Sequence, residues 1–143
     1  MIVSTKGRYA LRIMIDLAEH QSEGYIPLKE TAARQEISEK YLENILKILV
    51  KNKFLEGLRG KGGGYRLTKA PEEYTVGSIL RLTEISLAPV SCLEPDAPAC
   101  SRMATCRTLP MWQGLNNLIN DYLDNITLAE LMNQVQFGGD YVI

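Results

Sequence analysis

The glycine-rich run at residues 60–64 limits the fold of this 143-residue chain more than any other segment. It reads Gly60-Lys61-Gly62-Gly63-Gly64, which is too flexible for a helix or a strand. The segments on either side, residues 55–59 and 65–68, have the composition of two short strands. The sequence therefore predicts a β-hairpin with a flexible, basic tip near the middle of the chain.

Three helical segments are predicted before the hairpin. The first covers residues 5–20 and can be capped by Ser4 or Thr5, and the second covers residues 28–35, led by Pro27. Ser38 can cap a third helix that runs to about Asn52. Apolar residues recur at helical spacing on the first and third helices: Tyr9, Ala10, Ile13, Met14 and Leu17, and Leu42, Ile45, Leu46 and Leu49.

The second and third helices fit a helix-turn-helix, a motif that needs a small residue, a tight turn and a capped recognition helix. Ala32 is the small residue, and Glu36 stands in the turn where glycine is commoner. Any two packed helices can imitate this pattern, but the hairpin that follows favours a winged helix-turn-helix. The predicted fold class is therefore mainly α with a small β-hairpin wing.

A long C-terminal helix extends this architecture. The sequence predicts a helix over residues 75–85, a loop over 88–107, a helix over 110–124 and a short helix from Thr127, followed by a loosely held tail at 137–143. We expect a DNA-binding domain at residues 1–70, and a linker helix, cysteine loop and dimerisation helix at 71–143. The long helix carries an apolar stripe that a symmetric partner can bury, although it could instead pack on its own core: Met111, Leu115, Leu118, Ile119, Tyr122 and Leu123.

Charge is divided unevenly along the chain. Residues 1–69 hold 13 Lys and Arg against 8 Asp and Glu, a net +5, whereas residues 70–143 have a net −6. A basic half suits a polyanionic partner such as DNA, although segregated surface charge alone could give the same balance. No apolar run approaches the ~20 residues of a membrane span, and no signal-peptide pattern is present, so we expect a cytoplasmic protein without membrane contact.

Three groups of residues are predicted to contact a palindromic operator in double-stranded DNA. Lys40 and Tyr41 suit phosphates, Glu43 can accept from the cytosine amino group, and Asn44 can pair with adenine. Glu43 could instead pair with Lys40 or Lys47. A nucleotide-binding loop at the hairpin is disfavoured because no Gly-Lys-Ser/Thr opens a helix there. The full set is Ser4, Thr5, Lys6 and Arg8; Ser38, Lys40, Tyr41, Glu43 and Asn44; and Arg59, Gly60 and Lys61.

All three cysteines, Cys92, Cys100 and Cys106, lie in the predicted loop with the spacing C-x7-C-x5-C. Zinc ribbons have C-x2-C pairs, and an odd count in a cytosolic chain argues against a disulfide framework. Three thiolates can hold an iron–sulfur cluster if a fourth ligand is supplied, and Arg102 and Arg107 favour thiolates. Direct sensing of redox state or nitric oxide is the alternative.

Three segments resemble the signature segments of the Rrf2 family of bacterial regulators. They are Ser4-Thr-Lys-Gly-Arg-Tyr-Ala-Leu-Arg12, Ile37-Ser-Glu-Lys-Tyr-Leu-Glu43 and Arg59-Gly-Lys-Gly-Gly-Gly-Tyr-Arg-Leu67. The resemblance continues through residues 76–79, the cysteine loop and residues 126–131. It implies a homodimeric winged-helix transcription factor whose long C-terminal helix packs against its twin.

The resemblance also implies a cofactor. IscR-like and NsrR-like members bind an iron–sulfur cluster, 2Fe-2S or 4Fe-4S, through three cysteines usually spaced C-x5-C-x5-C. This chain has Leu109 where IscR-like members have a histidine ligand and Arg8 where NsrR-like members have an acidic one. The fourth ligand is therefore open, with Glu94, Asp96 or a small exogenous ligand as candidates; His20, the only histidine, is more simply a surface residue.

Two kinds of regulator remain. In the first, cluster binding orders the loop and changes the spacing of the two DNA-reading units. In the second, which is CymR-like, no cluster is bound and a regulatory protein partner of cysteine metabolism controls the protein. An enzyme is not expected, because H-E-x-x-H, C-x-x-C and G-x-S-x-G motifs are missing and the chain has one histidine.

Overall fold

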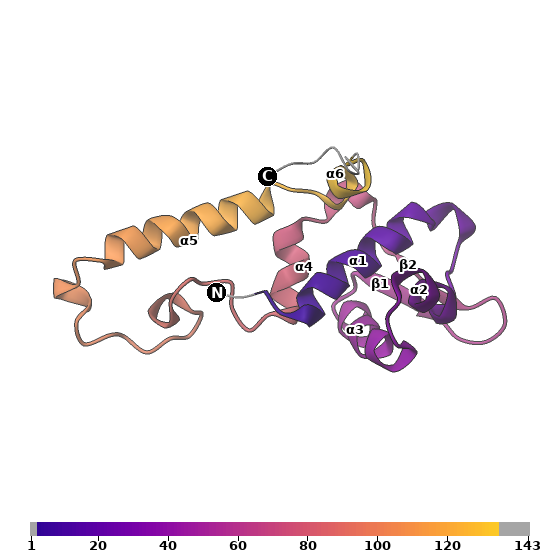
Figure 1. Cartoon of the computed structure of the whole chain (residues 1–143), viewed down its shortest axis with the longest axis horizontal. Helices are drawn as coiled ribbons and strands as arrows, with labels where there is room; N and C mark the ends of the chain where they lie inside the picture. Colours follow the sequence, from indigo (N-terminus) through magenta and orange to yellow (C-terminus); the bar gives the residue numbers. More distant parts are fainter. Residues whose placement is uncertain (1–2, 135–143) are drawn as a thin grey trace.

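The computed structural model describes residues 3–134 as a winged-helix body from which one long helix projects (Figure 1). The helices and strands follow the order α1 (Thr5–Glu19), α2 (Leu28–Gln35), α3 (Glu39–Lys51), β1 (Leu55–Leu58), β2 (Gly64–Leu67), α4 (Val76–Thr83), α5 (Leu109–Asp124) and α6 (Leu128–Met132). Single 3-10 turns lie at Gln21–Glu23, Pro71–Glu73, Ser91–Leu93 and Met103–Thr105. The predicted helices and strands are confirmed to within a few residues, and the predicted loose tail lies outside the described residues.

The main core lies between α1 and α3. The apolar positions predicted for these helices are buried, except for Tyr9, which is partly buried and packs against the core. Each large apolar side chain that is removed from water contributes about 1.5–3 kcal/mol. Tyr74, Ile79 and Leu128 complete the same core from the chain beyond residue 70. The division of the chain at residue 70 stays a prediction.

The segment at residues 71–74, between the hairpin and α4, is packed into the structure. Pro71 and Tyr74 are buried. The Tyr74 hydroxyl donates to the Phe54 carbonyl at 2.7 Å and accepts from the Thr68 amide at 3.0 Å. Tyr74 therefore ties the end of the wing to the start of α4.

The wing is an antiparallel hairpin in which Leu55 pairs with Leu67 and Leu58 with Gly64. Ile26 extends it by a bridge to Tyr65, with N–H···O distances of 2.9 Å in both directions. Gly64 has φ +147°, and a Cβ there would lie 2.2 Å from the Ile26 carbonyl oxygen. This position therefore requires glycine for both conformation and space.

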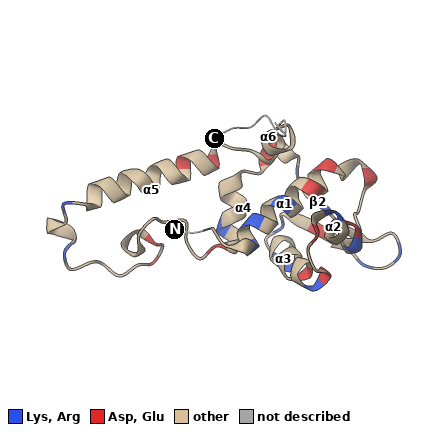
Figure 2. Ribbon diagram, in the orientation of Figure 1, with Lys and Arg blue, Asp and Glu red and all other residues tan. Residues whose placement is uncertain are grey.

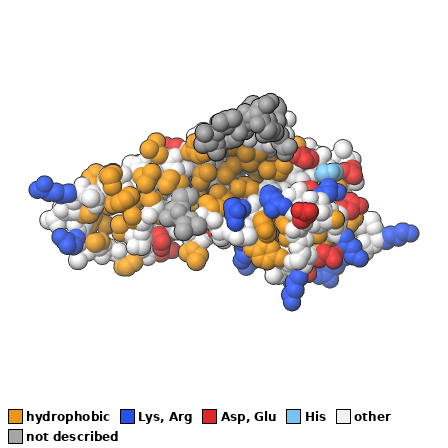
Figure 3. Space-filling view, in the orientation of Figure 1, with side chains coloured by type: hydrophobic (Ala, Val, Ile, Leu, Met, Phe, Trp, Pro, Cys, Tyr) orange, Lys and Arg blue, Asp and Glu red, His pale blue; other side chains and the backbone are white. Residues whose placement is uncertain are grey.

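Helix α5 is held to the body near its C-terminal end. The Arg81 guanidinium of α4 donates to Asp124 at 2.6 Å and to Asn120 at 2.6 Å. Leu123 packs against a second apolar cluster formed by Val76, Leu80 and Leu87. Apolar side chains are exposed along the projecting part of the molecule, with polar atoms between them (Figure 3). Among residues 3–134, no helix is long and apolar enough to span a membrane.

Candidate nucleic-acid interface

The turn between α2 and α3 has the geometry of a helix-turn-helix. Glu36 ends α2 in the left-handed conformation, with φ 54°. The Ser38 hydroxyl then accepts a hydrogen bond from the Tyr41 amide at 3.2 Å and caps α3. The first amides of a helix have no carbonyl partner within the helix, and the Ser38 hydroxyl satisfies one of them. The cap therefore fixes the residue at which α3 begins, and the first turn of α3 faces solvent.

A buried carboxylate fixes α1 against α2. Asp16 is 3% exposed and accepts from the Arg34 guanidinium at 2.8 and 3.0 Å and from the side-chain amide of Gln35 at 2.9 Å. Burial on its own raises the pKa of Asp16, but the hydrogen bonds from Arg34 and Gln35 outweigh it, so that the pKa is lowered. Arg12 also donates to the Gln35 carbonyl. The motif is therefore held by an ionised group as well as by apolar packing.

The exposed start of α3 presents residues that the sequence predicts to contact DNA. Lys40, Glu43 and Asn44 are exposed. Glu43 lies 3.7 Å from Lys47, one of the two partners expected for it, and both side chains are largely exposed. An exposed pair of this kind is worth only about 0–1 kcal/mol, so Glu43 can leave it to contact a base.

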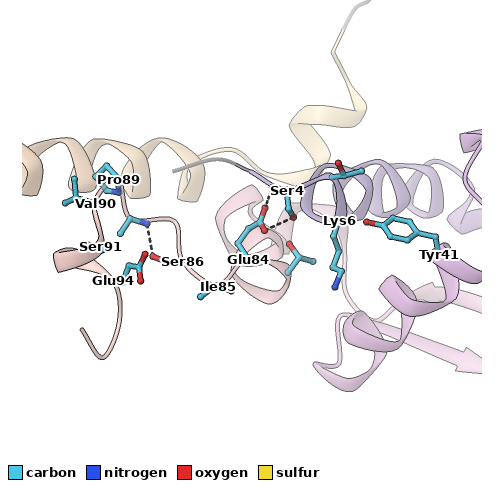
Figure 4. A pocket seen from close by; sticks show the side chains of 13 residues that line it. Ser4, Lys6, Tyr41, Glu84, Ile85, Ser86, Pro89, Val90, Ser91 and Glu94 are labelled. Atoms are coloured by element: carbon cyan, nitrogen blue, oxygen red, sulfur yellow. Dashed lines mark hydrogen bonds between the residues drawn. The ribbon is translucent and has the colours of Figure 1, made fainter. Parts of the chain in front are cut away.

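The start of α1 lies beside the start of α3. Thr5, Lys6 and Tyr41 line one open groove of about 1000 Å³, which residues 83–94 close on the other side (Figure 4). The Tyr41 ring meets the Tyr9 ring edge-on, with centroids 5.7 Å apart. Arg8 is exposed and donates to Thr5 at 3.2 Å. The fold thus gathers two of the three predicted groups of DNA contacts.

Ser4 differs from the other predicted contacts at the start of α1, because its hydroxyl already forms hydrogen bonds within the protein. The hydroxyl accepts from the Gly7 amide at 3.0 Å and donates to the Glu84 carboxylate at 2.7 Å. Sequence reasoning did not find Glu84, which lies 80 residues away along the chain, and no spacing in the sequence points to it.

The third predicted group lies at the tip of the wing. Arg59, Gly60 and Lys61 are all exposed in the loop that joins β1 to β2, and basic residues also mark this loop and the start of α1 in Figure 2. Behind the tip, Arg66 stacks over the Tyr25 ring at 4.2 Å and pairs with Glu56. The tip is thus carried on a braced hairpin, and its cations face solvent.

The cysteines lie on the segment that joins α4 to α5. Cys92 is half-buried in the turn Ser91–Leu93, whereas Cys100 and Cys106 line a separate shallow pocket. The hydrogen bond from Thr108 lowers the pKa of the Cys106 thiol, and the charge of Arg102 adds to this effect. Within residues 3–134 no three His, Cys, Asp or Glu side chains are close enough together to hold a metal ion.

Three thiols on one segment still match three of the four ligands that an iron–sulfur cluster needs. Glu94 and Asp96 are exposed on the same segment and could approach the thiols if it rearranged. His20 lies at the end of α1, where its Nδ1 is 2.8 Å from the backbone carbonyl oxygen of Asp16 in the same helix.

Comparison with known proteins decides the family. The model of the Rrf2 family, described as an iron-dependent transcriptional regulator, matches residues 3–134. The chain belongs to the Rrf2 family. The HTH-type transcriptional regulator IscR of Erwinia tasmaniensis is 40% identical over 133 residues, covering 93% of this chain and 79% of that protein. IscR of Aliivibrio salmonicida is 38% identical over 142 residues, covering 98% of this chain and 83% of that protein.

Solved structures agree with this assignment. CymR, the global cysteine regulator of B. subtilis, has a TM-score of 0.77 at 34% identity, covering 95% of this chain and 99% of that one. IscR of T. potens has a TM-score of 0.73 at 34% identity, covering 99% of this chain and 97% of that one. The predicted winged-helix fold and family are therefore confirmed. The chain is a DNA-binding transcriptional regulator of the IscR and CymR type, and its relatives are regulators rather than enzymes. The roles of the individual site residues stay predictions.

Proposed function

We propose that two copies of this Rrf2 regulator form a homodimer through α5 and bind a palindromic operator. The observation that carries the dimer is the uncovered stripe on α5. Met111, Leu115, Leu118 and Tyr122 are 56%, 39%, 68% and 69% exposed. An exposed apolar surface of this kind marks an interaction site in a globular protein. Ile119 is half-buried beside them, and Leu123 contributes mainly to the cluster within its own chain.

A two-fold axis through α5 would bring two copies of α3 to the same face of DNA. Helix-turn-helix dimers read half-sites that are about one helical turn, or roughly 34 Å, apart. In each copy, α3 would enter the major groove, the start of α1 would contact phosphates, and the wing tip would contact phosphates or the minor groove. The predicted contact residues supply the cations and hydrogen-bond donors for these roles.

The dimer is tested with Leu118→Asp and with Asn117→Asp as its matched control. Both variants add one carboxylate to the exposed surface of α5, but only Leu118 belongs to the apolar stripe. We expect sedimentation to show dimers for the wild type and Asn117→Asp, and monomers with weakened binding to a palindromic duplex for Leu118→Asp. A monomeric wild type, or a dimeric Leu118→Asp, would contradict an interface on α5.

The proposed sensor is an iron–sulfur cluster, 2Fe-2S or 4Fe-4S, held by Cys92, Cys100 and Cys106. Support comes from three thiols on one segment, the lowered pKa of Cys106 and the iron dependence in the family description. Glu94, Asp96 or a small exogenous ligand would complete the ligand set. When bound, the cluster would supply one-electron redox chemistry that is sensitive to oxidants and nitric oxide.

The position of the segment explains how such a site would regulate. It joins α4, which packs against α1, to α5, which carries the proposed dimer contact. Gathering three cysteines that lie apart would change the path of this segment and with it the spacing of the two DNA-reading units. Operator affinity would change by the difference in free energy between the two arrangements.

A regulator without a cluster, controlled by a protein partner, is the second candidate. It is favoured by the separation of Cys92 from the pocket that Cys100 and Cys106 line. Anaerobic reconstitution with iron and sulfide separates the two. We expect a visible absorbance band and bound iron in the wild type, and neither in a variant with all three cysteines changed to serine. No band in the wild type would favour the second candidate.

A further inference from the structure

Glu84 directly follows α4 and contacts the start of α1. The Ser4 amide donates to Glu84 Oε1 at 2.6 Å, and the Ser4 hydroxyl donates to Oε2 at 2.7 Å (Figure 4). The Glu84 amide donates to the Leu80 carbonyl at 2.8 Å, which fixes the backbone of Glu84 to α4. Both carboxylate oxygens are therefore used to hold one residue in place.

Helix α1 approaches this carboxylate closely because residue 7 is glycine. Gly7 is buried, and a Cβ at this position would lie 2.5 Å from Glu84 Oε1 and 3.2 Å from Leu80 Cδ2. Any larger side chain would push the carboxylate away from Ser4. The same Ser4 hydroxyl caps α1 by accepting from the Gly7 amide at 3.0 Å. The start of α1 is thus fixed in its conformation by the cap and in its position by Glu84.

The charge of Glu84 by itself is unfavourable for DNA binding. Glu84 lines the same groove as Thr5, Lys6 and Tyr41, which we expect to face phosphates. A negative charge there repels DNA, so its direct electrostatic effect opposes binding. A favourable effect of Glu84 on DNA binding must therefore act through the residues that it holds.

We propose that Glu84 is a positioning residue for DNA binding, which holds the start of α1 where Thr5 and Lys6 reach phosphates beside Tyr41. The proposal rests on the phosphate contacts proposed for Thr5 and Lys6. Glu84 joins α4 to the cysteine segment. In this proposal Glu84 supports the DNA-binding surface without itself contacting DNA.

The test is the sign of the effect of Glu84→Gln. A glutamine oxygen can accept only one of the two Ser4 hydrogen bonds, and its NH2 group can only donate to the Ser4 hydroxyl, so both contacts become weaker neutral ones. Removing a carboxylate should by itself strengthen DNA binding. Displacing the start of α1 should instead weaken it by about one phosphate interaction per protomer, which is roughly tenfold for each such interaction at 0.1 M salt. The slope of log K against log salt should become shallower by about 0.9 for each phosphate that the protein no longer neutralises.

Binding is measured on a palindromic duplex that the wild type selects from random-sequence DNA. Glu130→Gln is the matched control, because it removes the same charge from an exposed position on α6. Gly7→Ala is a second variant, which displaces the Glu84 carboxylate without changing any charge and should weaken binding in the same way. Circular dichroism and the unfolding midpoint establish that each variant is folded.

Lys6→Ala and the double variant Lys6→Ala/Glu84→Gln complete the experiment. We expect Lys6→Ala to lower affinity and slope, and the double variant to be impaired by less than the sum of the two single effects. If Lys6→Ala is impaired while Glu84→Gln and Gly7→Ala bind as tightly as the wild type, the role of Glu84 is wrong and the phosphate contact of Lys6 stands. If Lys6→Ala binds normally, the proposed phosphate contact fails and the role of Glu84 fails with it.

Discussion

Asp16→Asn perturbs the contact that holds the helix-turn-helix to α1. The carboxylate is 3% exposed and accepts three strong hydrogen bonds from Arg34 and Gln35, at 2.8, 3.0 and 2.9 Å. An asparagine has nearly the same volume, but it loses the charge and turns an NH2 group towards one of these donors. The variant thus leaves the Arg34 guanidinium without its carboxylate partner and creates no cavity.

The expected loss of stability depends on how far each member of the Asp16–Arg34 pair is buried. Removing one partner of a buried ion pair typically costs about 3–5 kcal/mol. The Arg34 side chain is 32% exposed, so water can partly solvate the guanidinium once its partner is removed. We therefore expect Asp16→Asn to lower the free energy of unfolding by about 2–3 kcal/mol at neutral pH. Glu30→Gln is the control: Glu30 lies 3.8 Å from the same Arg34 but is 53% exposed, so its removal should cost below about 1 kcal/mol.

The pH dependence of the stability difference provides a second, independent test of this prediction. The folded-state pKa of Asp16 is lowered, so its contribution to stability is complete above the unfolded value of about 3.9 and is lost as pH falls through the lowered pKa. The difference between the wild type and Asp16→Asn should therefore be constant near neutral pH and shrink in acid. Urea denaturation at fixed protein concentration measures both quantities. A difference below about 1 kcal/mol at pH 7, or one that grows in acid, would show that the ionised carboxylate does not hold the motif.

Three further predictions concern local features of the fold and are tested by urea denaturation. Ser38→Ala removes the cap whose hydroxyl accepts from the Tyr41 amide at 3.2 Å, and should cost about 1 kcal/mol; an unchanged stability would mean that water replaces the cap. Gly64→Ala should cost more than Gly24→Ala, about 2–3 kcal/mol against about 1, because both have positive φ but only Gly64 has a carbonyl oxygen 2.2 Å from the added Cβ; equal costs would contradict the close approach of Ile26. Thr31→Val should be neutral or stabilising by up to about 1 kcal/mol, because the buried Thr31 hydroxyl has no hydrogen-bond partner among residues 3–134; a clear destabilisation would reveal a partner such as bound water.

Most of the fold could be predicted because its signals are local. The apolar periodicity of α1 and α3 and the Ser38 cap each lie within a few residues of the element they define. Gly64 shows the limit of this reasoning. The sequence predicted a flexible hairpin tip, but the need for glycine at residue 64 comes from Ile26, a strand neighbour 38 positions earlier in the chain.

The candidate site could be predicted only in part, for the same reason. Helix caps and exposed charges indicated the start of α3 and the wing tip, and the three cysteines were found by spacing. The hydrogen bonds of Ser4 with Glu84 and of Arg34 with Asp16 join residues that are far apart in the chain. No periodic pattern in the sequence indicates these contacts. The sequence placed the three cysteines in one loop, but it could not show how they lie within it. Cys92 lies in a separate turn from Cys100 and Cys106.

The sequence by itself determined the elements of this regulator, because hydrogen bonds within a helix or a hairpin depend on residues that are near one another in the chain. Only the tertiary structure decided which side chains meet at the groove between the starts of α1 and α3, which apolar residues of α5 remain uncovered, and which carboxylate is buried with a partner. These outcomes depend on contacts between distant segments, and such contacts form only when the whole core closes.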